Sequence, residues 1–196
     1  TPPAWWNDLC LAIPTDMAIS SDGSTLYVAA FGSRKIGVVD TDALALAPGA
    51  PGSYDPNDPN TSAQVELSAG GPGGVVLDEA NDRLYVLTRF DNAISIVNTN
   101  TNAEIGHIPV HSPELPSITN GRRFLYDARF SSSNGEPSCA SCHVFGDFDS
   151  LSWDLGDGTP GAEAAWNNNP FVLLNPPLQN FALAGPALNV LPPGTD

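Results

Sequence analysis

The feature of this chain that most constrains its fold is an internal repeat. Residues 13–41 align without a gap with residues 71–99. The triplet Leu-Tyr-Val at 26–28, for example, recurs at 84–86. Repetition of a segment of this kind indicates a supersecondary unit that is stacked against copies of itself.

Each copy contains the same series of strand signals. A short apolar segment, at 17–19 and again at 75–77, leads through a polar turn into LYVAA or LYVLT, and a polar connection then leads into IGVVDT or ISIVNT. Short β-rich runs between turn residues are typical of antiparallel strands. A fourth strand is expected at 103–110. The expected fold is therefore mainly β, a partial β-propeller of two blades, followed by a loop-rich, partly helical segment.

An insertion follows the first copy. Residues 47–63 are rich in proline, glycine and asparagine and include Asp55, Asn57 and Asp58. Their oxygen atoms suit calcium, which prefers hard oxygen ligands, but their spacing matches no EF-hand. The alternative is that these turn residues are simply solvated.

The repeat resembles a known family. D-G-S-T-L-Y-V-A and I-G-V-V-D-T are similar to the Y-V-T-N family of β-propeller repeats, over residues 13–110. The resemblance implies a periplasmic or extracellular protein whose propeller part spans residues 1–111. Two blades cannot close a ring, because propellers typically have four to eight. We therefore expect further blades, from a missing N-terminal part of the polypeptide or from other chains.

The second part of the chain, residues 112–196, contains the motif S-C-A-S-C-H-V. Three chemistries compete for it. A structural zinc site usually has two cysteine pairs, and here His107 and His111 would have to complete the ligand set. A thioredoxin-type redox pair requires a helix N-terminus in a βαβ unit, which this region does not indicate.

A c-type haem is the third chemistry and the one that the spacing favours. It requires two thiols two residues apart and a histidine directly after the second, which Cys139, Cys142 and His143 supply. The expected cofactor is one covalent haem c. A short helix is also expected at 116–127, just before the motif.

A longer segment carries a second resemblance. G-R-R-F-L-Y-D-A-R-F-S-S-S-N-G-E-P-S-C-A-S-C-H is similar to the start of the haem domain in bacterial di-haem cytochrome c peroxidases and their relatives. V-F-G-D-F-D-S-L-S-W-D-L-G is similar to large secreted proteins that join Y-V-T-N propellers to such domains. The resemblance covers residues 114–158. It implies that Cys139 and Cys142 form the thioethers and that His143 is the proximal iron ligand.

Three of the seven basic residues cluster in the segment just before the motif. Arg122, Arg123 and Arg129 could pair with haem propionates, because a guanidinium matches carboxylate geometry. The alternative for each is a surface ion pair. The family pattern also includes a second C-x-x-C-H and a methionine ligand. Here the single methionine, Met17, is expected in a blade core, so the sixth iron ligand and any second haem stay open.

The charge of the chain restricts its partners. With 22 acidic and 7 basic residues the formal net charge is −15, which disfavours nucleic acid and anionic lipid. No run approaches the roughly 20 apolar residues of a membrane span. The acidic surface favours a basic redox partner such as a small cytochrome.

Three functions follow from these features. The first is a haem-dependent electron-transfer protein, part of a secreted peroxidase-like oxidoreductase. The second is a propeller-based binding or scaffold module with an accessory haem. The third is a structural zinc domain.

Overall fold

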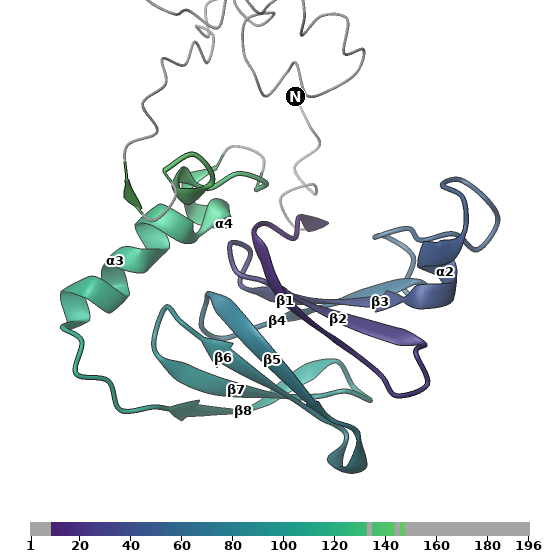
Figure 1. The fold of residues 1–196 in the computed structure, drawn as a ribbon, viewed down its shortest axis with the longest axis horizontal. Coiled ribbons are helices and arrows are strands. Elements are labelled where there is room, and N and C mark those ends of the chain that lie inside the picture. The colour runs from purple at the N-terminus through teal and green to yellow at the C-terminus, as the bar shows by residue number, and fades with distance from the viewer. Residues whose placement is uncertain (1–8, 133–134, 144–145, 148–196) are drawn as a thin grey trace, which may run out of the picture. The chain divides into compact units, whose positions relative to one another are not determined.

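Two four-stranded antiparallel sheets make up most of the part of the chain that the structure describes (Figure 1). The structure is a computed structural model that describes residues 9–132, 135–143 and 146–147. In order across each sheet, the strands are β1 (Pro14–Ile19), β2 (Thr25–Ala30), β3 (Lys35–Asp40) and β4 (Ser62–Glu66) in the first blade, and β5 (Pro72–Asp78), β6 (Arg83–Thr88), β7 (Ala93–Asn98) and β8 (Ala103–Pro109) in the second. The chain is therefore mainly β, with the two-bladed partial propeller that the repeat predicts.

The insertion displaces the fourth strand of the first blade along the sequence. α2 (Thr41–Ala45) follows β3 directly, and the Asp40 carboxylate caps it by accepting a hydrogen bond from the Ala43 amide (2.8 Å). A loop then leads into β4, which pairs with β3. The sequence does not predict β4, because the insertion removes it from the repeat. The strand expected at 103–110 is confirmed as β8.

The hydrophobic core lies between the facing surfaces of the two blades. Side chains alternate across a strand, so Leu84 and Val86 of β6 point toward the first blade while Leu87 points away. Leu84 is fully buried (0% exposed) and packs in one cluster with Ile36 of β3. The other buried members of this cluster are Tyr27, Ala29, Val38, Val65, Leu67, Val75, Val86 and Val97.

Hydrogen bonds also join the two blades where β1 lies beside β5. The Thr15 hydroxyl donates to the carbonyl of Pro72 (3.0 Å), and the Val75 amide donates to the Asp16 carboxylate (2.9 Å). Because both bonds connect a side chain of one blade to the backbone of the other, they fix the register between the sheets.

Each blade also has a face that points away from its neighbour. On the second blade this face carries Val76, Tyr85, Ile94 and Ile108, and Val76 is 66% exposed. On the first blade it carries Met17, which is 63% exposed. The expectation that Met17 occupies a core is therefore wrong, because its side chain lies on the open side of β1.

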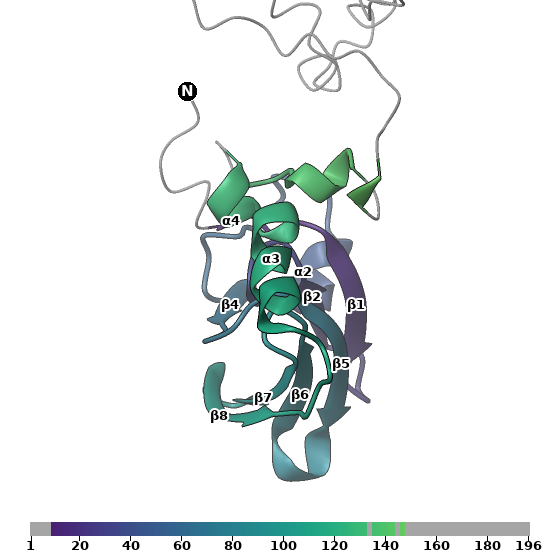
Figure 2. The same ribbon diagram turned by 90° about the vertical axis from the view of Figure 1, so that its left-hand side faces the viewer.

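A partly helical segment follows the second blade (Figures 1 and 2). The helix expected at 116–127 is confirmed as α3 (Pro116–Tyr126), with proline in its first turn, where the missing amide costs no hydrogen bond. α4 (Ala128–Ser131) and the short η2 (Cys139–Ser141) follow, while η1 (Glu79–Asn81) connects β5 and β6.

Residue contacts group Thr1–Asp147 in one unit. Among the described elements, no helix is long and apolar enough to cross a membrane. The domain boundary expected at 111/112 stays a prediction, since most of 112–196 lies outside the described residues.

Candidate functional site

Arg122 fastens α3 to the second blade. Its Nη1 donates to the carbonyl of Arg89 (2.6 Å) and to Oδ1 of Asn92 (3.0 Å), and its Nη2 forms an ion pair with Glu114. The Asn92 amide in turn donates to the second Glu114 oxygen (2.7 Å). Because the Arg122 guanidinium binds both the β6–β7 loop and the segment before α3, it positions the helix over the blade.

Aromatic rings connect the same helix to both blades. Phe31, in the β2–β3 loop, packs edge-to-face against Phe90 in the β6–β7 loop, with ring centroids 5.4 Å apart. Phe31 also packs edge-to-face against Tyr126 at the end of α3 (5.3 Å). The Ala128 amide then donates to the carbonyl of Gly32 (2.8 Å). The helix that leads to the C-x-x-C-H motif is therefore held by both sheets.

Arg129 and Lys35 share one acidic partner. Arg129 Nη1 lies 2.7 Å from Glu66 Oε2, and Lys35 Nζ lies 3.4 Å from Glu66 Oε1. Lys35 is almost fully buried and also donates to Gln64 Oε1 (3.0 Å). Glu66 thus neutralises two cations and links α4 to β3 and β4.

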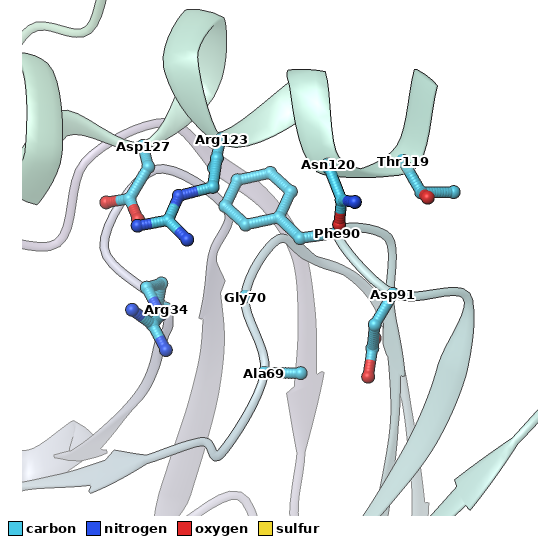
Figure 3. Close-up of a pocket in the computed structure, with 9 residues that line it drawn as sticks. All are labelled: Arg34, Ala69, Gly70, Phe90, Asp91, Thr119, Asn120, Arg123 and Asp127. Carbon is cyan, nitrogen blue, oxygen red and sulfur yellow. The ribbon is translucent and has the colours of Figure 1, made fainter. Parts of the chain in front are cut away.

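Arg123 differs from the other two predicted arginines. Its guanidinium carbon lies 5.8 Å from the ring centroid of Phe124 and 5.0 Å from that of Phe130. It also borders a cavity beneath α3 (Figure 3). Among the described residues, Arg122 and Arg129 are in ion pairs with carboxylates and Arg123 is not.

The residues of the C-x-x-C-H motif lie on and directly after one short turn, η2, that packs beside α3. A capping box of Ser138 and Ser141 closes the turn, in which the Ser138 amide donates to the Ser141 hydroxyl (3.1 Å). The His143 amide donates to the carbonyl of Cys139 (2.9 Å). Backbone hydrogen bonds therefore place the histidine one turn after the first cysteine.

A hydrogen bond of His143 fixes which of its ring nitrogens can bind a metal. Nδ1 lies 3.1 Å from the carbonyl oxygen of Asp147. A carbonyl oxygen only accepts, so Nδ1 carries the proton and Nε2 has the lone pair in the neutral ring. Metal-binding histidines commonly donate their other ring nitrogen in this way. Cys139, Cys142 and His143 thus fit the donor set of a c-type haem.

His107, considered above as a metal ligand, lies in a cluster on β8 instead. Its Nε2 lies 2.6 Å from Asp91 Oδ2, and its Nδ1 lies 3.0 Å from Ser95 Oγ and 3.3 Å from Glu104 Oε1. Ser95 is fully buried, so it cannot act as a nucleophile on a substrate in solution. The cluster therefore ties β7, β8 and the β6–β7 loop together.

The residues considered for calcium cap their own turns. Asp55 accepts from the amide and side chain of Asn57 (2.8 and 3.1 Å), and Asp58 does the same with Asn60 (2.9 and 2.7 Å). Within the described part of the chain, no group of three or more histidine, cysteine, aspartate or glutamate side chains is arranged to hold a metal ion.

The Glu114–Arg122 pair is expected to make stability depend on acidic pH. The Arg122 guanidinium, followed by the Asn92 amide, holds the pKa of Glu114 below its ordinary value of 4.5. A lowered folded-state pKa stabilises the fold above the ordinary value, and this contribution is lost as the pH falls through the folded-state pKa. We expect Glu114→Gln to be less stable than wild type at neutral pH, with the difference shrinking below about pH 4.5.

Urea unfolding of wild type and Glu114→Gln, from neutral to acidic pH, measures the difference in their stability. The exposed carboxylate variant Asp42→Asn, on α2, is the control and should show no such convergence. A constant difference between Glu114→Gln and wild type down to low pH would show that the ion pair is not formed in solution.

Comparisons with known proteins give fold-level similarity only. No family model and no curated protein matches the sequence. Similar solved structures include Kuenenia stuttgartiensis hydrazine synthase, at 20% identity and a TM-score of 0.40 over 50% of this chain and 24% of that chain. A nidogen/laminin complex is 14% identical, with a TM-score of 0.36 over 50% of this chain and 31% of that chain. Citrobacter koseri AztD is 13% identical, with a TM-score of 0.36 over 52% of this chain and 23% of that chain.

The chain thus spans about a quarter to a third of the length of these structures. At these identities and TM-scores, the assignment of the fold rests on the two sheets themselves.

Proposed function

We propose that Cys139 and Cys142 hold one c-type haem through thioether bonds, that His143 Nε2 binds its iron, and that the protein transfers electrons. The observation that carries this proposal is the hydrogen bond from His143 Nδ1 to the Asp147 carbonyl, on the same turn as the two cysteines. Bound there, the haem would supply one-electron redox chemistry.

The surrounding residues would orient the histidine and hold the turn that carries the two thiols. The Asp147 carbonyl orients the imidazole and, by accepting a hydrogen bond from its Nδ1–H, raises the basicity of Nε2. The capping box of Ser138 and Ser141 holds the turn that carries both thiols. α3 keeps this turn beside the blades, because Arg122 and the aromatic rings fasten the helix to both sheets.

The proposed protein combines two functional parts. Residues 1–111 would form propeller blades, and residues 112–196 a cytochrome segment related to the di-haem peroxidases. The resemblances of the repeat and of the C-x-x-C-H segment both support a periplasmic or extracellular location, where covalent haem attachment takes place. A peroxidase-like activity within a larger protein would fit the same relationship.

The open faces of the blades favour assembly with further blades. Val76 and Ile108 on the second blade and Met17 on the first are exposed apolar side chains on otherwise regular sheet faces. A neighbouring blade would bury them as the two described blades bury Leu84. We propose that this polypeptide or another chain supplies those blades.

Electron exchange with a small basic cytochrome tests the proposed function. We expect the reduced protein to pass one electron to the oxidised cytochrome, and the rate to fall as ionic strength rises, because the net charge of −15 attracts a basic partner. Stopped-flow absorbance measures both reactants.

Peroxide distinguishes the remaining alternatives. Oxidation of the reduced protein by peroxide, with turnover in the presence of a donor, would identify a peroxidase-like enzyme. A protein that neither exchanges electrons nor responds to peroxide would instead be a scaffold module. Zinc in place of haem would contradict the proposal and is detected by metal analysis.

A further inference from the structure

A cavity of about 150 Å³ lies between the blades and α3 (Figure 3). Arg34 of the β2–β3 loop, Gly70 of the β4–β5 loop and Phe90 of the β6–β7 loop contribute to its wall, and α3 contributes Arg123. Three loops and a helix from distant parts of the sequence therefore converge on one small space.

The basic residues of this acidic protein gather at the same end of the blades. All seven lie within the described part of the chain, and only Arg83, at the start of β6, belongs to the opposite end. The six others are Arg34, Lys35, Arg89, Arg122, Arg123 and Arg129. Three of these six, Lys35, Arg122 and Arg129, form ion pairs with Glu66 or Glu114.

Two of these six cations face the cavity without a carboxylate partner among the described residues. Arg34 makes one long hydrogen bond, from Nη2 to the carbonyl of Ser68 (3.4 Å). The Arg123 guanidinium packs on the rings of Phe124 and Phe130. Such stacking uses the face of the guanidinium and leaves its N–H edge to bind an acceptor.

Two aspartates, Asp91 and Asp127, also lie in the cavity wall, and both have other hydrogen-bonding partners. Asp91 accepts from the Thr88 hydroxyl through Oδ1 (2.7 Å) and contacts His107 through Oδ2 (2.6 Å), so both of its oxygens are engaged. Asp127 caps α4 by accepting from the Arg129 amide (3.1 Å). The cavity wall therefore holds two carboxylates and two guanidinium groups, and among the described residues neither Arg34 nor Arg123 forms an ion pair with either aspartate.

The backbone at Arg34 is a second sign of function. Arg34 has a φ of +59°, and Asn92, its counterpart in the second repeat, has a φ of +56°. Asparagine tolerates this left-handed conformation well, whereas arginine rarely adopts it. The first repeat therefore keeps a long cationic side chain at a position where its backbone is disfavoured.

We propose that this cavity binds the carboxylate of a small ligand between Arg34 and Arg123. Two guanidinium edges can bind a carboxylate with charge-assisted, paired hydrogen bonds. The Phe90 ring offers an apolar surface to the rest of the ligand, and the volume restricts that ligand to a small one. This proposal does not depend on haem attachment.

Thermal unfolding in acetate and in succinate tests the proposal, with sodium chloride at matched ionic strength as the reference. A ligand that binds only the folded protein raises the Tm as its concentration rises. We expect both carboxylates to raise the Tm above the chloride reference. Arg34→Gln and Arg123→Gln should each weaken the apparent affinity at least ~10-fold, because each removes a charged hydrogen-bonding partner.

Arg83→Gln is the matched control, since it makes the same charge change at the opposite end of the second blade. It should bind like wild type. If a glutamine variant fails to fold, Arg34→Lys or Arg123→Lys takes its place in the binding measurement, because lysine keeps the charge. Equal binding by the Arg34, Arg123 and Arg83 variants, or no Tm increase in either wild type or the haem-free variant Cys139→Ala/Cys142→Ala, would overturn the proposal.

Two sources of the carboxylate remain to be separated, a free small acid and a propionate of the haem proposed above. Cys139→Ala/Cys142→Ala distinguishes them. Acetate binding by both this variant and wild type would identify a free acid as the ligand. Acetate binding by the variant alone would identify the propionate as the occupant in wild type. In neither case does the outcome depend on redox activity.

Discussion

Replacing both Cys139 and Cys142 by alanine is expected to abolish covalent haem attachment. Cys139 begins η2 and Cys142 directly follows it, and no other cysteine pair in the chain has the C-x-x-C-H spacing. Expression together with a c-type haem maturation system, followed by haem staining of the denatured protein, measures the effect. We expect a strong band for wild type and none for the double variant.

Cys10→Ala is the matched control for this experiment. Cys10 is the third cysteine of the chain and precedes β1, far in sequence from the motif. Its replacement should leave the haem stain unchanged. Staining of the double variant at the wild-type level would place the haem elsewhere and contradict the proposed site.

Leu84→Ala is expected to cause the largest loss of stability among single substitutions in the blades. The side chain is fully buried in the cluster between the two sheets. Truncation of a buried leucine removes apolar burial and leaves a cavity, which lowers the free energy of unfolding by about 2–5 kcal/mol. Chemical denaturation monitored by circular dichroism gives this value.

Leu87→Ala provides a comparison within the same strand. Leu87 is 41% exposed on the opposite face of β6, so its truncation should cost less than about 1 kcal/mol. Equal losses for the two variants would mean that the blades do not pack through the Leu84 face in solution. A larger loss at Leu87 would indicate that another blade covers that face.

The repeat predicts most of the fold because its strands carry their own local signals. Alternating apolar residues and turn residues recur in both copies and place six strands there, and the segment after the second copy places β8. The insertion hides β4, which pairs with β3 through long-range contacts. The wrong prediction that Met17 lies in a blade core has a different cause. Alternation shows that a strand has two faces, but which face another blade covers depends on tertiary packing.

The candidate site was predictable only where its residues are neighbours in sequence. Cys139, Cys142 and His143 form a local motif, whereas the Asp147 carbonyl that orients the histidine is a backbone group without a sequence signature. Arg122 is similar, because its partners come from the β6–β7 loop and from Glu114. The arginine count alone could not show which cation each carboxylate neutralises.

Arg34 and its cavity were not identified from the sequence. The one available signal was the alignment of Arg34 with Asn92, which puts an arginine where the second repeat has a residue suited to a left-handed turn. The convergence of three loops and α3 on Arg34 became visible only in the folded chain.

The mass of the intact, denatured wild-type protein tests the central claim most directly. After expression with haem maturation and removal of non-covalent ligands, the account predicts a single species equal to the 20.5 kDa polypeptide plus one haem. A mass equal to the unmodified polypeptide would contradict the account.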